Sequence, residues 1–208
     1  MTGSLRYLDP IWSTPFRTRR YEPAPLYLLR LTLATLYTIG HSTRTIEELV
    51  AALAVHRVET LVDIRAFPMS RRLPQFNRES LEQTLPAAGV RYQWMKALGG
   101  YRKKILEESP NIALRNPSFR NYADYMLAPE FGQATSELLA LAAGSRTAYM
   151  CAERPYFRCH RMLVSDWLVA HGHQVFHIDA TGPVKPHTLT AEGRIIDGRL
   201  IYRGDRLL

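Results

Sequence analysis

The chain has 208 residues, 46% of them apolar, which suffices for one globular domain with its own core and excludes an intrinsically disordered chain. Lysine and arginine outnumber aspartate and glutamate by 27 to 19, a formal net charge of +8. This balance favours an anionic partner, either an anionic small molecule or a nucleic acid, without choosing between them. A solvated basic surface without a partner explains the charge equally well.

Residues 1–30 are rich in proline and arginine, and we interpret them as a basic, poorly ordered N-terminal extension. The arginines before residues 26–37 resemble the start of a signal peptide, but Arg30 interrupts the apolar stretch and no small-residue cleavage site follows. No apolar run is long enough to span a bilayer. We therefore expect a cytoplasmic protein, with no membrane contact, whose domain covers residues 31–208.

The first half of this domain predicts alternating strands and helices. Leu36–Ile39 is a short apolar run typical of a strand. Thr45 is a suitable helix N-cap, because Glu48 three residues later completes a capping box. Val58–Ile64 is nearly continuous in apolar residues, as expected of a strand buried on both faces of a parallel sheet. A polar, proline-containing loop follows, from Arg65 to Asn77.

The second half continues the alternation. We expect helices at Arg78–Leu85, Phe119–Leu127, Glu130–Ala143 and Cys159–His171, strands at Val90–Met95, Thr147–Cys151 and Gln174–Ile178, and a mobile surface loop at Leu98–Pro117. Asp197-Gly198 fits a type I′ turn and predicts a hairpin over Arg194–Tyr202. The fold class is therefore α/β, a single domain with a mainly parallel central sheet flanked by helices and a short C-terminal β-hairpin.

Chemically reactive side chains gather where the predicted strands end. They are His41 and Ser42 after the first strand, Asp63 and Arg65 at the end of the second, Cys151 and Glu153 at the end of a later strand, and Cys159, His160 and Arg161 at the start of the following helix. Ligands of open α/β sheets bind outside the carboxyl ends of the strands. We therefore expect these groups to converge on one site.

Such a site predicts thiolate chemistry on an anion. A helix N-terminus binds anions and lowers the pKa of a cysteine placed there. The candidate catalytic residues are Cys151, Cys159, His160, Glu153, His41 and Asp63, and Arg65 and Arg161 are candidate oxyanion ligands. Either cysteine could be the nucleophile, and the sequence does not decide.

Plainer interpretations compete with this one. Cys151 is equally suited to a small core position. Asp63 and Arg65 could form a structural ion pair that pins a loop, and His41 could simply bond a turn. A metal at Cys151, Cys159 and His160 is the least favoured alternative, because the C-x7-C-H spacing matches no common zinc pattern. We predict no cofactor.

Several segments, in chain order, resemble the DUF488 family, a bacterial and archaeal group without an established function. They are Tyr37–Thr43, Leu61–Arg65 with Pro68 and Ser70, Gln75–Asn77, Leu98–Gly100, Tyr122–Met126, Cys151–Glu153 and Cys159–Arg161, and also Pro186–Thr190 with the hairpin. The resemblance covers roughly residues 36 to 203. It adds Ser70, Asn77 and Tyr122, with Ser42, to the candidate substrate-binding residues.

A more distant similarity joins Thr45–Leu49, the strand ending at Asp63, and Cys151 to rhodanese domains, which implies a rhodanese-like three-layer fold. In rhodaneses and cysteine phosphatases, a short loop after the cysteine closes on an arginine. Here Arg158 lies seven residues after Cys151 and Arg161 ten. The resemblance therefore implies an anion cradle rather than sulfur transfer or phosphatase activity.

Two functional hypotheses follow. The first is a cysteine-dependent enzyme, a transferase or hydrolase, that acts on a phosphate-bearing, nucleotide or nucleic-acid substrate held at the helix N-terminus. The second is a non-catalytic nucleic-acid-binding module. It rests on aromatic residues such as Trp94 and on the basic run Arg102–Lys104, which together suit base stacking and phosphate contact.

Overall fold

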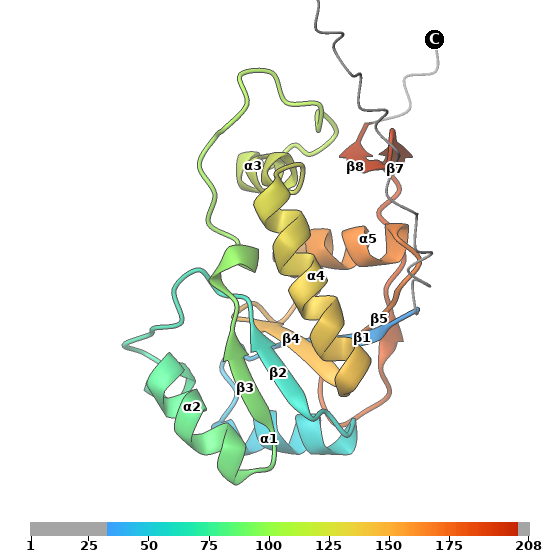
Figure 1. Cartoon of the computed structure of the whole chain (residues 1–208). Coiled ribbons are helices and arrows are strands. Elements are labelled where there is room, and N and C mark those ends of the chain that lie inside the picture. The colour runs from blue at the N-terminus through green and yellow to red at the C-terminus, as the bar shows by residue number, and fades with distance from the viewer. Residues whose placement is uncertain (1–32, 204–208) are drawn as a thin grey trace, which may run out of the picture. The chain divides into compact units, whose positions relative to one another are not determined.

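The apolar runs of the sequence form the strands of a six-stranded sheet in the computed structural model, which describes residues 33–203 (Figure 1). In spatial order the strands are β3 (Arg91–Trp94), β2 (Thr60–Asp63), β4 (Thr147–Cys151), β1 (Thr35–Gly40), β5 (Gln174–Ile178) and β6 (Lys185–Pro186). The first five run parallel, and only β6 is antiparallel. Every residue of β2 and β4 is buried, as strands covered on both faces require.

Helices cover both faces of the sheet and make three layers. On one face, α1 (Ile46–Val55) and α2 (Arg78–Ala87) pack their apolar side chains against Ile39 and Leu61. On the other face, α3 (Pro117–Tyr125), α4 (Pro129–Gly144) and α5 (Arg161–Ala170) pack against Val62. Neighbouring strand residues such as Leu61 and Val62 point to opposite faces, so the two cores are separate. The expected α/β class is confirmed.

The C-terminal hairpin is also confirmed. Its strands are β7 (Gly193–Ile196) and β8 (Arg199–Tyr202), which form an antiparallel two-stranded sheet. Asp197 and Gly198 have φ angles of +49° and +73°, the left-handed conformation that both central residues of a type I′ turn adopt. Tyr202 of β8 is buried, so the hairpin contributes to the core.

Three details differ from expectation. Helix α5 begins at Arg161 rather than Cys159, because a 3-10 turn, η3 (Tyr156–Arg158), precedes it and Cys159 is extended. The loop expected at Leu98–Pro117 has its first residue in a short 3-10 helix, η2 (Lys96–Leu98), and its last residue in α3. Strand β6 was not anticipated, since two residues carry no periodicity. Residues 1–30 lie outside the described part. None of the described helices is long and apolar enough to cross a membrane.

The capping box of α1 gives the first testable prediction. Thr45 Oγ1 accepts a hydrogen bond from the Glu48 amide at 3.2 Å, and Glu48 Oε2 accepts one from the Thr45 amide at 2.8 Å. We expect Thr45→Ala to lower the free energy of unfolding by about 1 kcal/mol in urea titrations, since one helix amide loses its partner. The matched control Thr43→Ala, at an exposed position in the same loop, should change it by less than about 0.5 kcal/mol. Equal effects would contradict the prediction.

Candidate active site

Both cysteines lie where β4 ends and α5 begins. Cys151 is the last residue of β4, and Cys159 and His160 immediately precede the first turn of α5. A cavity of about 360 Å³ opens there, which we call the cysteine cavity, and its lining includes Arg65, Cys151, Glu153, Arg158, Cys159 and His160. The expected convergence of strand ends is therefore found for these residues.

The imidazole of His160 lies between the two sulfurs. Its Nδ1 is 3.8 Å from Cys151 Sγ and 3.6 Å from Cys159 Sγ. Its Nε2 is 3.0 Å from the carbonyl oxygen of Ile64. Because a carbonyl oxygen only accepts, Nε2 carries a proton, and Nδ1 is the atom free to exchange a proton with the thiols.

The backbone at Gly100 and the side chain of Tyr122 hold this imidazole in place. The Tyr122 ring packs against it with centroids 5.2 Å apart, and the Tyr122 hydroxyl donates to the Leu98 carbonyl at 2.8 Å. A Cβ at Gly100 would lie 2.7 Å from His160 Cγ, so no larger residue fits there without displacing the ring. The Gly99-Gly100 pair is therefore explained by close approach rather than by loop mobility.

The two thiols differ in acidity. The pKa of Cys159 is lowered, first because Cys151 donates a hydrogen bond to its sulfur and then through His160 and the charge of Arg161. The pKa of Cys151 is raised well above its usual range by that same hydrogen bond and by burial. Glu153 Oε2 lies 3.2 Å from Cys151 Sγ and is an alternative hydrogen-bond acceptor for the single hydrogen of that thiol. The pair therefore favours a thiolate at Cys159 beside a thiol at Cys151.

The same groups also have the donor set of a metal site. The ligand atoms of Cys151, Cys159 and His160 all lie within 4.8 Å of one another. A histidine ligand whose other nitrogen donates to a backbone carbonyl is the usual arrangement around zinc, and three protein ligands would leave a fourth position open. The geometry is thus compatible with a thiophilic metal, an alternative that the sequence spacing disfavours.

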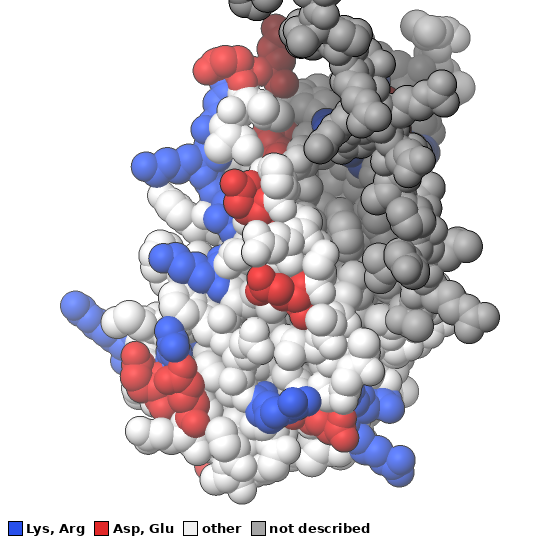
Figure 2. Space-filling model, viewed as in Figure 1, with Lys and Arg blue, Asp and Glu red and all other residues white. Residues whose placement is uncertain are grey.

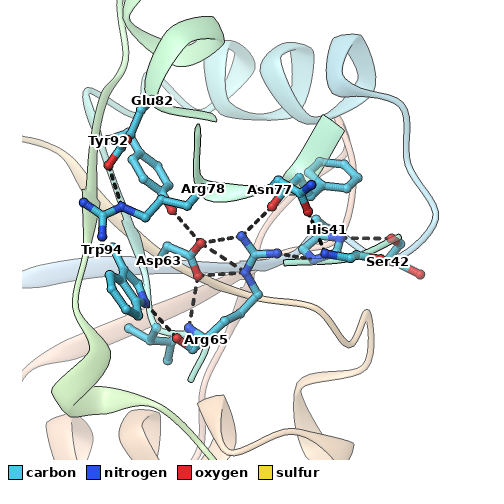
Figure 3. Close-up of polar contacts among 12 residues, drawn as sticks. His41, Ser42, Asp63, Arg65, Asn77, Arg78, Glu82, Tyr92 and Trp94 are labelled. Carbon is cyan, nitrogen blue, oxygen red and sulfur yellow. Dashed lines mark hydrogen bonds and ion pairs between the residues drawn. The ribbon is translucent and has the colours of Figure 1, made fainter. Parts of the chain in front are cut away.

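Figure 3 shows a buried ion pair between Asp63 and Arg65, of which Arg65 also lines the cysteine cavity. Arg65 Nε is 2.9 Å from Asp63 Oδ1 and Arg65 Nη2 is 2.5 Å from Asp63 Oδ2, and both side chains are buried. Arg65 also donates to the carbonyl of Phe76 at 2.7 Å, and Tyr92 donates to Asp63 at 2.7 Å. The charge of Arg65 is therefore balanced, and the pair fixes the path of the loop that runs to Phe76.

His41 completes this network. Arg65 Nη1 donates to His41 Nε2 at 3.2 Å, and His41 Nδ1 donates to the Ser42 carbonyl at 3.0 Å (Figure 3). Burial, followed by the charge of Arg65, lowers the pKa of His41 to about 4, so the ring is neutral near pH 7. His41 thus contacts Arg65 and is not part of the lining of the cysteine cavity.

The other predicted residues lie outside this cavity. The Ser70 amide donates to Asn77 Oδ1 at 2.6 Å and Ser70 Oγ accepts from the Leu73 amide at 3.1 Å, which shapes the loop. Arg161 is buried and donates to Thr38 Oγ1 at 3.0 Å. Sequence reasoning did not select Arg158 or Gly100 as site residues. The Gly99-Gly100 pair and the arginine in the loop after Cys151 are the sequence features that could have indicated these two residues.

The family match covers most of these elements. A family model described as Domain of unknown function DUF488 matches residues 45–168, which contain both cysteines, His160 and the Asp63–Arg65 pair. The chain belongs to the DUF488 family. No curated protein and no solved structure matches it. The DUF488 match thus includes the main lining of the cysteine cavity, while His41 lies before it and β5 to β8 lie after it.

Gly100 gives a packing prediction. We expect Gly100→Ala to lower the free energy of unfolding by about 1–3 kcal/mol, because the added methyl overlaps the His160 ring. The matched control is Gly132→Ala in α4, where a Cβ meets no atom within 4 Å, and it should stabilise by about 0.5–1 kcal/mol. Urea denaturation measures both, and a neutral Gly100→Ala would contradict the packing described.

His41 gives a pH prediction. In the unfolded chain this ring binds a proton below about pH 6.5, whereas in the folded chain it does so only below about pH 4. Because the unfolded chain binds more protons between these values, the free energy of unfolding decreases as the pH falls from about 6.5 to about 4. We expect wild type to lose about 2 kcal/mol more than His41→Gln between about pH 7 and pH 4.5. His56→Gln at the end of α1 should retain the wild-type loss. An unchanged loss in His41→Gln would refute this.

Proposed function

We propose that the protein is a cysteine-dependent enzyme, a transferase or hydrolase, that acts on an anionic, phosphate-bearing substrate in the cysteine cavity. The observation that carries the proposal is the His160 imidazole, whose Nδ1 is within 4 Å of both sulfurs while Nε2 is held by the Ile64 carbonyl. This is the thiol–imidazole contact that activates nucleophilic cysteines.

Cys159 is the proposed nucleophile. Its lowered pKa favours the thiolate, and Cys151 keeps its proton and donates a hydrogen bond to the Cys159 sulfur. The imidazole of His160, protonated at Nδ1, then pairs with the thiolate. Cys151 is a positioning residue in this scheme, with Glu153 Oε2 as the alternative acceptor of its hydrogen bond.

The reaction follows from these roles. Cys159 Sγ attacks the electrophilic centre of the substrate, the bond to the leaving group breaks, and His160 Nδ1 delivers its proton to that group. In the second step a water or acceptor hydroxyl attacks the same centre and gives its proton to His160. The bond to sulfur breaks, and the thiolate and imidazolium are restored.

Arg158 supports the choice of an anionic substrate. It lines the cysteine cavity, and within residues 33–203 it forms no ion pair, whereas the charge of Arg65 is balanced by Asp63. Phe67 and Tyr101 lie at the same cavity with exposed rings, 5.9 Å between centroids. These rings suit an apolar or base portion of the substrate.

Iodoacetamide alkylation across a pH series tests the proposal. We expect Cys159 to react with an apparent pKa below about 7, compared with about 8.5 for a free thiol. His160→Gln should slow the reaction about tenfold or more near pH 7, because the imidazolium that stabilises the thiolate is lost. Cys159→Ser should remove the fast phase, and Cys151→Ser, whose hydroxyl still donates, should retain it. Peptide mapping by mass spectrometry identifies the modified sulfur.

Two results would overturn the thiolate mechanism. One is that neither cysteine reacts faster than a free thiol near neutral pH. The other is one bound zinc per chain in metal analysis, lost in both Cys151→Ser and Cys159→Ser, with fast alkylation only after a chelator removes the metal. That result would assign the cluster to metal binding.

A nucleic-acid-binding module is the second candidate function. The exposed rings of Phe67 and Tyr101 favour it, since stacked bases bind such surfaces. On the face drawn in Figure 2, however, basic side chains alternate with acidic ones, and Lys104 pairs with Glu107 at 3.1 Å. Salt-sensitive binding of single-stranded DNA or RNA that survives Cys159→Ser would favour this function over catalysis.

A further inference from the structure

A second cavity of about 360 Å³ shares no lining residue with the cysteine cavity. It lies between the segment Arg154–Phe157, the end of β5 and Lys185 of β6. We call it the Arg161 cavity, because the side chain of Arg161 forms part of its wall. Two buried polar atoms of its lining have no hydrogen-bond partner, Arg161 Nε and His177 Nδ1.

Arg161 is a buried cation without a counter-charge. It is 1% exposed, and its guanidinium donates only to uncharged acceptors, the Thr38 hydroxyl and the carbonyls of Glu153 and Arg154. No carboxylate of the described residues lies within 4.0 Å of it. A buried charge without a counter-ion destabilises the folded protein, and a bound anion would supply that counter-ion.

His177 presents a hydrogen-bond acceptor to the same cavity. The Asp166 carboxylate accepts a hydrogen bond from the Tyr202 hydroxyl at 2.9 Å, and its other oxygen lies 2.8 Å from His187 Nε2. Because a carboxylate only accepts, His187 Nε2 carries a hydrogen and donates it to Asp166. His187 Nδ1 must then accept from His177 Nε2, 2.9 Å away. His177 Nδ1 is left with a free lone pair, and burial, then His187 and Arg161, lower the pKa of His177 to about 3.

The rim of the cavity adds charge and apolar surface. Lys185 lies there on β6 without an ion pair among the described residues, whereas Arg154 is paired with Asp179 at 2.8 Å. Phe157 is 57% exposed, and Tyr156 stacks on the His177 ring with centroids 3.5 Å apart. A ligand in this cavity thus meets cations, one acceptor and an aromatic face.

We propose that the Arg161 cavity binds a phosphate monoester with an apolar or aromatic body. The singly protonated phosphate group supplies both partners, an anionic oxygen for Arg161 Nε and Lys185, and a P–OH that donates to His177 Nδ1. The organic body lies against Phe157. This site is separate from the proposed active site, because the two cavities share no lining residue, and binding there does not require the Cys159 sulfur.

Calorimetric titration of the full chain with phenyl phosphate tests this site. We expect saturable binding that Lys185→Gln weakens about threefold to tenfold, since one charge-assisted contact is lost. Arg161→Lys should weaken it about tenfold or more, because a lysine does not reproduce the Nε–H contact. Lys104→Gln, an exposed control outside this cavity, and Cys159→Ser should both bind as wild type does.

Arg161 is buried, so its variant requires a check of folding by circular dichroism, and Lys185→Gln carries the test if that variant unfolds. Absence of binding to the wild type, or equal affinity in Lys185→Gln, would overturn the site. Phenol binding as tightly as phenyl phosphate would do the same, because the phosphate would then contribute nothing. Inorganic phosphate binding as tightly as phenyl phosphate would overturn the monoester assignment. Loss of binding in Cys159→Ser would contradict the independence of the two cavities.

Discussion

The hydrogen bonds from Arg161 to the carbonyls of Glu153 and Arg154 fix the path of the chain between β4 and α5, and both cavities depend on that path. On one side of this segment the cysteines meet His160. Gly40 at the end of β1 lies so close to the Glu153 carbonyl that a Cβ would overlap it, and Arg161 also bonds Thr38 of β1. The buried guanidinium thus joins the first strand to the loop that leads from Cys151 to Cys159. Replacing Arg161 with an uncharged residue would therefore leave the carbonyls of Glu153 and Arg154 without these hydrogen bonds, in addition to removing the buried cation.

Local patterns were enough to predict most of the fold. The capping box at Thr45, the apolar run of β2 and the Asp197-Gly198 turn each act through neighbouring residues, and all three are found as predicted. The start of α5 and strand β6 were not predicted correctly, because a 3-10 turn and a tertiary pairing decide them. Sequence reasoning also placed the cysteines and His160 together correctly, since the ends of parallel strands share one edge of the sheet.

What the sequence could not predict is the direction of long side chains. Arg65 and Arg161 were both expected at the anion, and tertiary contacts give them different surroundings: Asp63 neutralises Arg65, while Arg161 meets only uncharged oxygens. The chain from His177 through His187 to Asp166 joins residues of β5, the segment after β6, and α5. No spacing in the sequence indicates it, because its geometry exists only once the sheet and α5 have packed. The surroundings of Cys151 are compatible with both of its interpretations, because it is buried like a small core residue and its sulfur also contacts His160.

The position of β1 in the sheet has a consequence for how the domain is made. This strand is the first in the described chain, yet it pairs with β4 and β5, whose residues follow it by more than a hundred positions. During synthesis β1 therefore emerges long before either neighbour, and both of its hydrogen-bonding edges stay unpaired until β4 and β5 have followed it. Closure of the sheet is then a late event in the synthesis of this domain.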